Sequence, residues 1–215
     1  MIRSAAMAIL LATTVIAQAA EGEKFKADPA QGKALAEAIC VACHGADGNS
    51  EVPDSPTINP KLAGQVEEYL YKQLSNFVPV GDKPALRDNP IMFGMAATLD
   101  EEGKRNVAAW FASQKLNPAV VQDQSRLPLG QRLWRQGDHK KGIPACAGCH
   151  GPAGAGMPAQ YPRLAGQFPE YTAIQLKAFR LEERGNDPEK MMRMIAAKLS
   201  DAEIQAVSEY AASLR

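Results

Sequence analysis

Hydrophobic side chains recur at three- and four-residue intervals in several segments of this 215-residue chain, and no segment alternates in the manner of a β-strand. Asp28 and Pro29 form the start signal of a first helix, which leads to Cys40. A second helix is predicted to begin near Gln65 and a third after the N-cap residue Asp100. The apolar faces of these helices consist of Leu35 and Ile39, of Val66, Tyr69, Leu70, Leu74 and Phe77, and of Val107, Trp110 and Phe111.

The same pattern returns in the second half of the chain, which identifies an internal duplication. The segment Pro60-Lys61-Leu62-Ala63-Gly64-Gln65 matches Pro162-Arg163-Leu164-Ala165-Gly166-Gln167 at an offset of 102 residues. Three helices are predicted in this half. They start near Pro128, near Gln167 at the end of the second segment, and at the capping residue Ser200. Eight additional residues, 136–143, are expected to form a loop. Aromatic residues that both copies share are expected in the two cores, at Tyr69, Phe77, Tyr171 and Phe179.

The repeat divides the chain into two domains of about 100 residues. At this size, a core formed by the polypeptide alone gives only marginal stability. Residues 1–19 have the charged, apolar and small-residue order of a secretory signal peptide, with cleavage expected after Ala19. An uncleaved anchor is the alternative. We therefore predict an N-terminal domain at 20–116, a linker at 117–127, a C-terminal domain at 128–215, and export to the periplasm.

Two pentapeptides carry the chemistry, Cys40-Val41-Ala42-Cys43-His44 and Cys146-Ala147-Gly148-Cys149-His150. Two thiols at this spacing bond the vinyl groups of one haem, and the adjacent imidazole binds its iron. A redox-active CxxC needs no histidine, and zinc sites bring two CxxC pairs closer together in sequence. We predict two covalently bound haem c groups, attached through Cys40, Cys43, Cys146 and Cys149, with His44 and His150 as axial ligands.

The opposite axial position requires another ligand, and the duplication selects it. The third histidine, His139, lies in the additional loop without a counterpart in the first half, so we expect it at the surface. Aligning Leu99 with Leu199, at an offset of 100, pairs Met92 with Met192. No other methionines are duplicated in this way. Met92 and Met192 are therefore the predicted ligands of the N-terminal and C-terminal iron.

Met95 and Met191 are the alternative ligands, and Met95 and Met194 are otherwise expected to fill core space. Histidine and thioether ligands together raise the haem potential and occupy every coordination position of the iron. An iron without a vacancy transfers electrons without making bonds. We therefore predict an electron carrier with no catalytic residues, and not an enzyme.

These residues resemble the dihaem cytochromes c4 over nearly the whole predicted mature chain. The similarity lies in Cys40 to His44 with the following Gly45-Ala46-Asp47-Gly48-Asn49-Ser50, in both Leu-Ala-Gly-Gln segments, and in Ala196-Ala197-Lys198-Leu199-Ser200. The resemblance implies an all-α fold, a tandem pair of class I cytochrome c domains related by pseudo-twofold symmetry. It also implies that the Pro60 and Pro162 carbonyls accept hydrogen bonds from His44 and His150.

The resemblance implies a role in carrying electrons from a quinol-oxidising complex or a periplasmic dehydrogenase to a terminal oxidase. The alternative is a cytochrome subunit of a dehydrogenase complex such as flavocytochrome sulfide dehydrogenase. A third possibility, a dihaem peroxidase or thiosulfate-oxidising cytochrome, requires an open or unusually ligated iron. The sequence offers no spare cysteine and one spare histidine for that purpose.

Charge adds one feature to this picture. The chain is neutral overall, but residues 20–122 hold ten basic and fourteen acidic side chains, a net −4, whereas residues 123–215 hold thirteen and ten, a net +3. Such a dipole orients a molecule toward charged partners. The expected partners are a cytochrome bc1-type complex, a terminal oxidase or a dehydrogenase. We expect a monomer that binds no nucleic acid, and peripheral association with the membrane is an open alternative.

Overall fold

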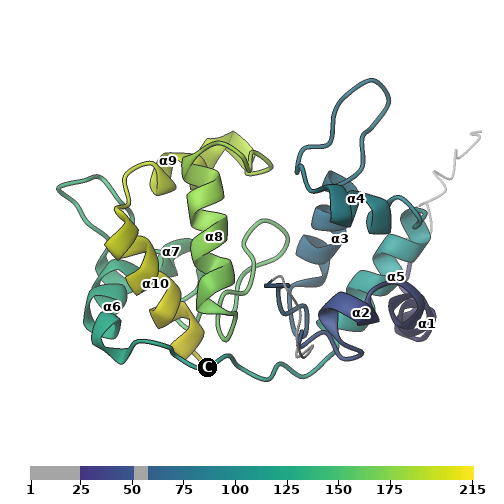
Figure 1. The fold of residues 1–215 in the computed structure, drawn as a ribbon, viewed down its shortest axis with the longest axis horizontal. Coiled ribbons are helices and arrows are strands. Elements are labelled where there is room, and N and C mark those ends of the chain that lie inside the picture. The colour runs from purple at the N-terminus through teal and green to yellow at the C-terminus, as the bar shows by residue number, and fades with distance from the viewer. Residues whose placement is uncertain (1–24, 51–57) are drawn as a thin grey trace, which may run out of the picture.

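The computed structural model describes residues 25–50 and 58–215, so the predicted signal peptide lies outside the described residues. Two helical domains stand side by side and a linker runs along one edge of both (Figure 1). The first contains α1 (Pro29–Ile39), α2 (Val41–His44), α3 (Glu67–Asn76), α4 (Pro90–Ala96) and α5 (Glu101–Ala112). The second contains η1 (Gln124–Arg126), α6 (Leu127–Gln136), α7 (Ala147–His150), α8 (Pro169–Arg180), η2 (Pro188–Lys190), α9 (Met191–Ala196) and α10 (Asp201–Ser213).

The predicted helix starts are confirmed by their capping contacts. The Asp28 carboxylate accepts hydrogen bonds from the first turn of α1, and Asp100 accepts one from Gly103 N at the start of α5. Ser200 and Glu203 form the reciprocal capping box that opens α10. No strand forms in residues 25–50 and 58–215, where β-pairing is limited to isolated bridges. The all-α prediction is therefore confirmed.

Each domain is built on the crossing of its first and last long helices, α1 on α5 and α6 on α10. Gly32 and Gly130 occupy these two crossings. A Cβ atom would lie 1.9 Å from the Asn106 carbonyl oxygen at Gly32 and 2.1 Å from the Ala206 carbonyl oxygen at Gly130. The helices approach so closely that only glycine fits at either crossing.

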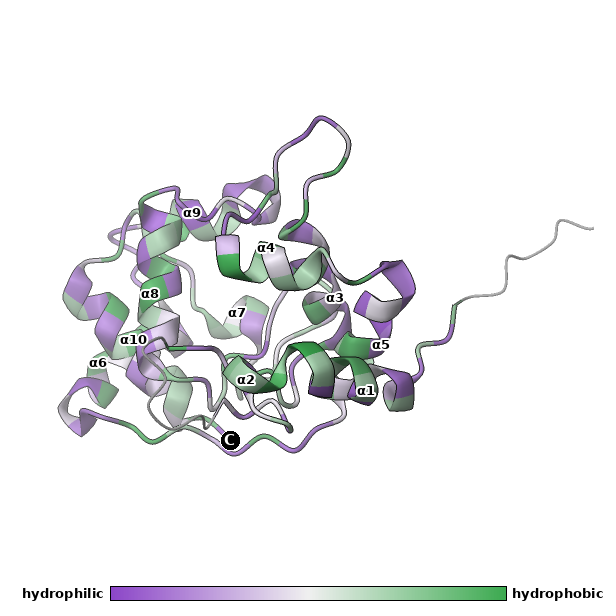
Figure 2. Cartoon of the chain, turned by 45° about the vertical axis from the view of Figure 1, so that its right-hand side comes forward, coloured by the Kyte–Doolittle hydropathy of each residue, from purple (hydrophilic) through white to green (hydrophobic). Residues whose placement is uncertain are grey.

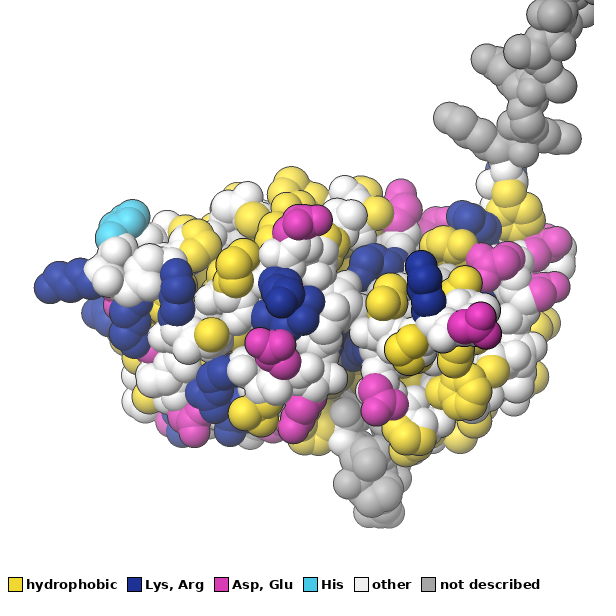
Figure 3. All heavy atoms as spheres, turned by 90° about the horizontal axis from the view of Figure 1, so that it is seen from above, with side chains coloured by type: hydrophobic (Ala, Val, Ile, Leu, Met, Phe, Trp, Pro, Cys, Tyr) yellow, Lys and Arg dark blue, Asp and Glu magenta, His cyan; other side chains and the backbone are white. Residues whose placement is uncertain are grey.

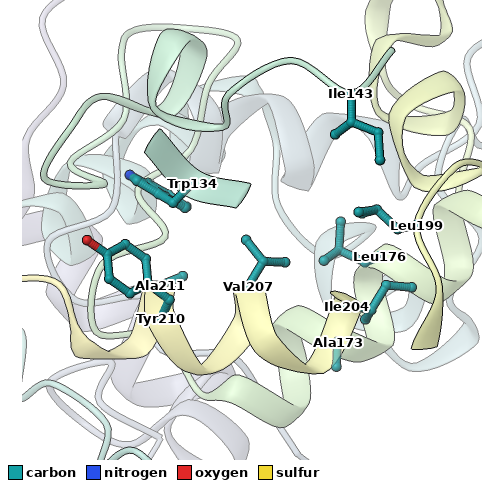
Figure 4. Close-up of a cluster of buried hydrophobic side chains, with 9 residues drawn as sticks. All are labelled: Trp134, Ile143, Ala173, Leu176, Leu199, Ile204, Val207, Tyr210 and Ala211. Carbon is teal, nitrogen blue, oxygen red and sulfur yellow. The ribbon is translucent and has the colours of Figure 1, made fainter. Parts of the chain in front are cut away.

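Apolar side chains from these helices form one core in each domain. The N-terminal core contains Ala36, Leu70, Leu99, Val107, Ala108 and Phe111. The C-terminal core contains Trp134, Ile143, Ala173, Leu176, Leu199, Ile204, Val207, Tyr210 and Ala211, with Val207 pointing from α10 toward the middle of the cluster (Figure 4). Both cores also contact a cysteine of the pentapeptide, Cys40 or Cys146.

The additional residues of the second half form a pinned turn. Gly137 has a positive φ of 70°, and the backbone amide and carbonyl groups of Asp138 and Ile143 bond each other at 2.8 Å. This contact buries Ile143, which is 2% exposed, in the C-terminal core. His139 is exposed at the tip of the turn, as predicted. The insertion therefore contributes a core residue that the first domain lacks.

Two glutamines join the domains by a reciprocal exchange. The Gln65 side chain bonds both the amide and the carbonyl group of Arg163, and the Gln167 side chain bonds the same two groups of Lys61. All four distances lie between 2.7 and 3.0 Å. Because these are equivalent positions of the repeat, the exchange is the pseudo-twofold symmetry that was predicted.

The segment between the domains is bound to both of them. The side-chain oxygen of Asn49 accepts from Asn117 N at 2.8 Å, and the buried Glu209 carboxylate accepts from Gln122 N at 2.8 Å. Ala119 N donates to Gly166 O. In the part of the chain that the structure describes, no helix is long and apolar enough to cross a membrane.

Candidate functional site: two haem centres

Each pentapeptide forms a single helical turn. His44 N donates to Cys40 O and His150 N donates to Cys146 O, both at 2.9 Å. A turn of this kind places the second cysteine and the histidine of each pentapeptide on one short helix, α2 or α7, with the first cysteine as its N-cap residue. The local sequence alone therefore assembles three of the groups that a haem c needs.

Both histidines are buried in the same way. His44 and His150 are 6% and 7% exposed, and their Nδ1 atoms lie 3.0 Å from the carbonyl oxygens of Pro60 and Pro162. Burial lowers the pKa of each imidazole, and the bond to the carbonyl opposes this only in part. A neutral ring whose Nδ1 donates to a carbonyl keeps the Nε2 lone pair for a metal. The implied pairing with Pro60 and Pro162 is confirmed.

The first thiol of each pentapeptide is a poor nucleophile in the protein chain. Burial, followed by the charge of Cys43, raises the pKa of Cys40 to about 11. Burial also raises the pKa of Cys146 to about 11. A redox-active CxxC instead requires a lowered pKa. Among the described residues, no group of three His, Cys, Asp or Glu side chains is placed to hold a metal ion.

The duplicated methionines are less exposed than Met95 and Met194 on the same helices. Met92, in the first turn of α4, is half-buried, whereas Met95 on the same helix is 41% exposed. Met192 is half-buried against the C-terminal core, whereas Met194 is 55% exposed. Met95 and Met194 therefore do not fill the core as predicted, because α4 and α9 are short and turn these side chains outward. Met191 is half-buried, and the Tyr161 hydroxyl lies 4.0 Å from its sulfur.

Sequence reasoning missed a polar cluster between the domains. Tyr69 and Tyr171, predicted to be core residues, bond Arg184 and Arg87 of the opposite domain. The signal was present as a second repeated motif, Arg-x-Asn at 87–89 and at 184–186. Its offset of 97 differs from the offsets of 100 and 102 elsewhere, because the two intervening loops differ in length.

Comparisons with known proteins agree with this geometry. The Cytochrome c family profile matches twice, at residues 29–115 and 129–215. A cytochrome c4 from Thiocapsa roseopersicina is 46% identical over 85% of this chain and 91% of its own. A thiosulfate dehydrogenase electron acceptor from Stutzerimonas stutzeri is 39% identical over 92% of this chain and 88% of its own. The crystal structure of reduced recombinant cytochrome c4 from Pseudomonas stutzeri superimposes with a TM-score of 0.80 and 40% identity, covering 88% of this chain and all of that one.

Proposed function

Since the chain belongs to the cytochrome c4 family and is a dihaem electron-transfer protein with two covalently bound haem c groups, we propose that it is a periplasmic carrier. It takes electrons from a quinol-oxidising complex or a periplasmic dehydrogenase and delivers them to a terminal oxidase. The predicted leader supports the periplasmic location. The proposed domains are residues 20–116 and 128–215.

The proposed ligand sets follow the duplication. Cys40 and Cys43 attach the first haem, with His44 and Met92 on its iron. In the second domain the corresponding residues are Cys146, Cys149, His150 and Met192. One observation carries this proposal: in both domains a buried histidine holds its Nδ1 at 3.0 Å from a proline carbonyl, and a half-buried methionine lies in the first turn of a short helix at the matching position of the repeat.

The residues of the chain restrict what each haem does. Haem supplies one-electron chemistry, and the chain orients the imidazole and keeps water away from it. Because the Nδ1 atoms of His44 and His150 bond carbonyl groups, the orientation of both rings is fixed by the chain. Filling both axial positions leaves no place for substrate. The proposal therefore includes no catalytic residue and no enzymatic activity.

A dehydrogenase is the first electron donor to test. Two relatives, 39% and 36% identical, are electron acceptors of thiosulfate dehydrogenase. Apolar side chains on the exposed surface of α4, Ile91 and Phe93, are 61% and 44% exposed. Such side chains favour short-lived protein contacts near a redox centre. The same features keep a permanent cytochrome subunit of a dehydrogenase complex as the second candidate.

The ligand assignment is tested with Met92→Ala and Met192→Ala in the holoprotein. Each substitution is expected to remove the methionine-to-iron signature from one haem in optical and electron paramagnetic spectra, while the other haem keeps it. Met95→Ala and Met194→Ala are the matched controls, because both side chains are exposed, and they should leave the spectra unchanged. An unchanged spectrum in Met92→Ala or Met192→Ala would rule out that ligand.

The role as a carrier is tested by purification and by stopped-flow kinetics. A carrier separates from other proteins and is reduced by purified thiosulfate dehydrogenase at a rate that saturates with donor concentration. A permanent subunit instead copurifies with its dehydrogenase at a fixed ratio through successive columns. Failure of reduction by that enzyme would exclude it as the donor and leave the other proposed donors for the same assay.

A further inference from the structure

The proline carbonyls that hold the pentapeptide histidines belong to peptide groups that the opposite domain also binds. Pro60 O lies 3.0 Å from His44 Nδ1, and the N–H of the same peptide group, which is that of Lys61, donates to Gln167 Oε1 at 2.9 Å. In a trans peptide group the C=O and the N–H point in opposite directions, so the histidine and the glutamine lie at its two ends. One peptide group therefore connects a histidine of one domain to a glutamine of the other.

The second domain repeats this arrangement with the roles exchanged. Pro162 O lies 3.0 Å from His150 Nδ1, and Arg163 N donates to Gln65 Oε1 at 2.7 Å. Each glutamine also returns a bond from its Nε2 to the carbonyl oxygen of the residue whose N–H it accepts, at 2.9 Å for Gln167 and 3.0 Å for Gln65. Two bonds to one residue fix the amide plane of each glutamine, so its oxygen faces the peptide N–H.

These bonds between the domains are shielded from water. Gln65 is 9% exposed, Gln167 is 7% exposed and Lys61 is 4% exposed. The oxygen of each glutamine also accepts from the N–H of the residue that follows it, Val66 or Phe168. Hydrogen bonds inside a protein are electrostatically stronger than in water, and bonds in a chain strengthen one another by about 10–30%. The glutamine bond is therefore expected to strengthen the bond at the other end of the same peptide group.

A stronger bond at Nδ1 changes the histidine as an iron ligand. When the imidazole N–H donates to a more negative carbonyl oxygen, the ring becomes a more basic ligand through its Nε2. A more basic ligand favours the ferric iron, which carries one more positive charge, and so lowers the haem potential. Gln167 should thus lower the potential of the haem held by His44, and Gln65 that of the haem held by His150.

We propose that Gln167 and Gln65 are positioning residues that tune the axial histidine of the opposite domain, each through the peptide group that follows a proline. The inference rests on the proposed function, in which His44 and His150 bind the two irons. In this role each glutamine acts through the peptide group and the histidine, and not by contact with the iron. The contact between the domains is thereby part of both redox centres, because each domain supplies the last bond of the chain that sets the potential of the other.

The test is a redox titration of the holoprotein with Gln167→Met and Gln65→Met, followed by NMR so that each potential is assigned to a domain. Methionine is similar in length to glutamine and makes neither of its hydrogen bonds. Gln167→Met should raise the equilibrium constant for reduction of the N-terminal haem about threefold, which is about 28 mV for one electron, and leave the C-terminal haem unchanged. Gln65→Met should do the reverse. In both variants the potential moves in the domain that was not mutated.

The direction and the crossed pattern separate tuning from a loosened contact. A contact that opens admits water, which stabilises the more positive oxidised haem and lowers the potentials. The proposal is overturned if each variant shifts the haem of its own domain, if both potentials fall together, or if neither potential moves. Gln114→Met is the matched control, because Gln114 Nε2 bonds Trp110 O and Ser113 Oγ of its own domain. It should leave both potentials unchanged.

The imidazole N–H gives a readout that does not depend on the potential. The chain has three histidines and His139 is exposed, so the buried Nδ1–H signals of His44 and His150 can be assigned in the reduced, diamagnetic protein labelled with ¹⁵N-histidine. A weaker hydrogen bond moves such a proton to lower chemical shift. Gln167→Met should move the signal of His44, and Gln65→Met that of His150. Unchanged signals in both variants would overturn the proposal even if the potentials shift.

Ser50→Ala examines the Pro60 carbonyl without disturbing the contact between the domains. The Ser50 hydroxyl also donates to Pro60 O, so this oxygen is shared by two donors. Removing one donor should strengthen the bond to His44 and lower the potential of the N-terminal haem alone, the opposite of the effect of Gln167→Met. A potential that stays the same or rises would show that the strength of the His44 bond does not set it, which overturns the proposal.

These outcomes remain distinct from failure of the proposed function. A wild-type protein whose haems lack a histidine ligand contradicts the ligand assignment before any glutamine is changed. A variant that keeps two haems and both methionine signatures reports on its glutamine alone, and one variant that assembles is sufficient. Should neither assemble, amide hydrogen exchange of the wild type decides the question. Protected amides at Lys61 and Arg163 would support the proposal, and exchange as fast as in an unfolded chain would overturn it.

Discussion

The N-terminal and C-terminal domains share their helix crossings and the surroundings of their histidines, but they differ in one core residue and in their surfaces. Both cross their first and last helices at a glycine, and both hold the haem histidine to a proline carbonyl at 3.0 Å. The C-terminal domain adds the pinned turn that buries Ile143. In the N-terminal domain, α4 exposes Ile91, Phe93 and Met95, whereas in α9 only Met194 is a strongly exposed apolar residue.

The outer surfaces of the two domains also differ. Hydrophobic residues lie along α4 (Figure 2). On the face drawn in Figure 3, more basic side chains are visible over the C-terminal half than over the N-terminal half. The site for the cofactor is thus the same in both domains, while the surface offered to a partner is different. Two copies of one domain can in this way receive an electron on one surface and release it from another.

The strongest challenge to the equivalence of the domains is to remove one haem. Cys146→Ala should unfold most of the C-terminal domain and leave the N-terminal haem spectrum intact, because a domain of about 100 residues has a marginal core without its haem. Far-ultraviolet circular dichroism and haem content measure the loss. Cys40→Ala is the reciprocal variant and should reverse the pattern. Full helicity and a sharp melt in either variant would contradict this view of domain stability.

A smaller perturbation compares the two helix crossings. Gly32→Ala and Gly130→Ala should each cost about 4 kcal/mol of unfolding free energy, because the added Cβ meets a backbone carbonyl oxygen. Gly94→Ala is the matched control in an exposed helix, where a Cβ has no neighbour within 4 Å, and it should stabilise by up to about 1 kcal/mol. Chemical denaturation measures all three. If Gly32→Ala and Gly130→Ala leave the unfolding free energy nearly unchanged, the helices can move apart to accept the added Cβ.

Ile143→Ala addresses the difference between the domains. Loss of this buried side chain should cost about 3 kcal/mol and lower the melting temperature of the C-terminal domain only. Val80→Ala is the matched change in the N-terminal domain, since Val80 also forms an isolated bridge but is 73% exposed. It should have almost no effect. Equal losses from the two variants would mean that the turn contributes little to the core.

The smallest effect concerns the carboxylate that ties this turn to α10. Burial alone would raise the pKa of Glu203, but hydrogen bonds from Lys141 and Ser200 outweigh it and lower the pKa. A lowered pKa stabilises the fold above the unfolded value near 4.5, and this contribution is lost as pH falls below it. Glu203→Gln should cost at most about 1 kcal/mol at neutral pH.

The control for this change is Glu102→Gln, at an exposed position in the first turn of α5, which should alter stability by about 0.3 kcal/mol or less. Thermal melts of both variants and the wild type at several pH values provide the measurement. The difference between Glu203→Gln and the wild type should shrink as pH decreases toward 3. A difference that grows instead would mean that the carboxylate is not the stabilising form.

The sequence by itself determined the features that depend on neighbouring residues. Cysteine pairs with an adjacent histidine predict the haem, because one helical turn contains all three groups. Asp28, Asp100 and Ser200 predict helix starts, because a cap bonds amides within three residues. The duplication then aligned Met92 with Met192. None of these inferences required knowledge of a long-range contact.

Only the tertiary structure decided what lies between the domains. Tyr69 and Tyr171 matched the helical period of core residues, yet they bond arginines more than 80 positions away in the sequence. Likewise, Met95 is a methionine that we expected to fill the core, but it is 41% exposed on a short helix. Helical periodicity states which residues share a face, but it does not state whether that face meets a haem, a second domain or solvent. That choice depends on the packing of the two copies against each other, and it places the arginines beside both of them.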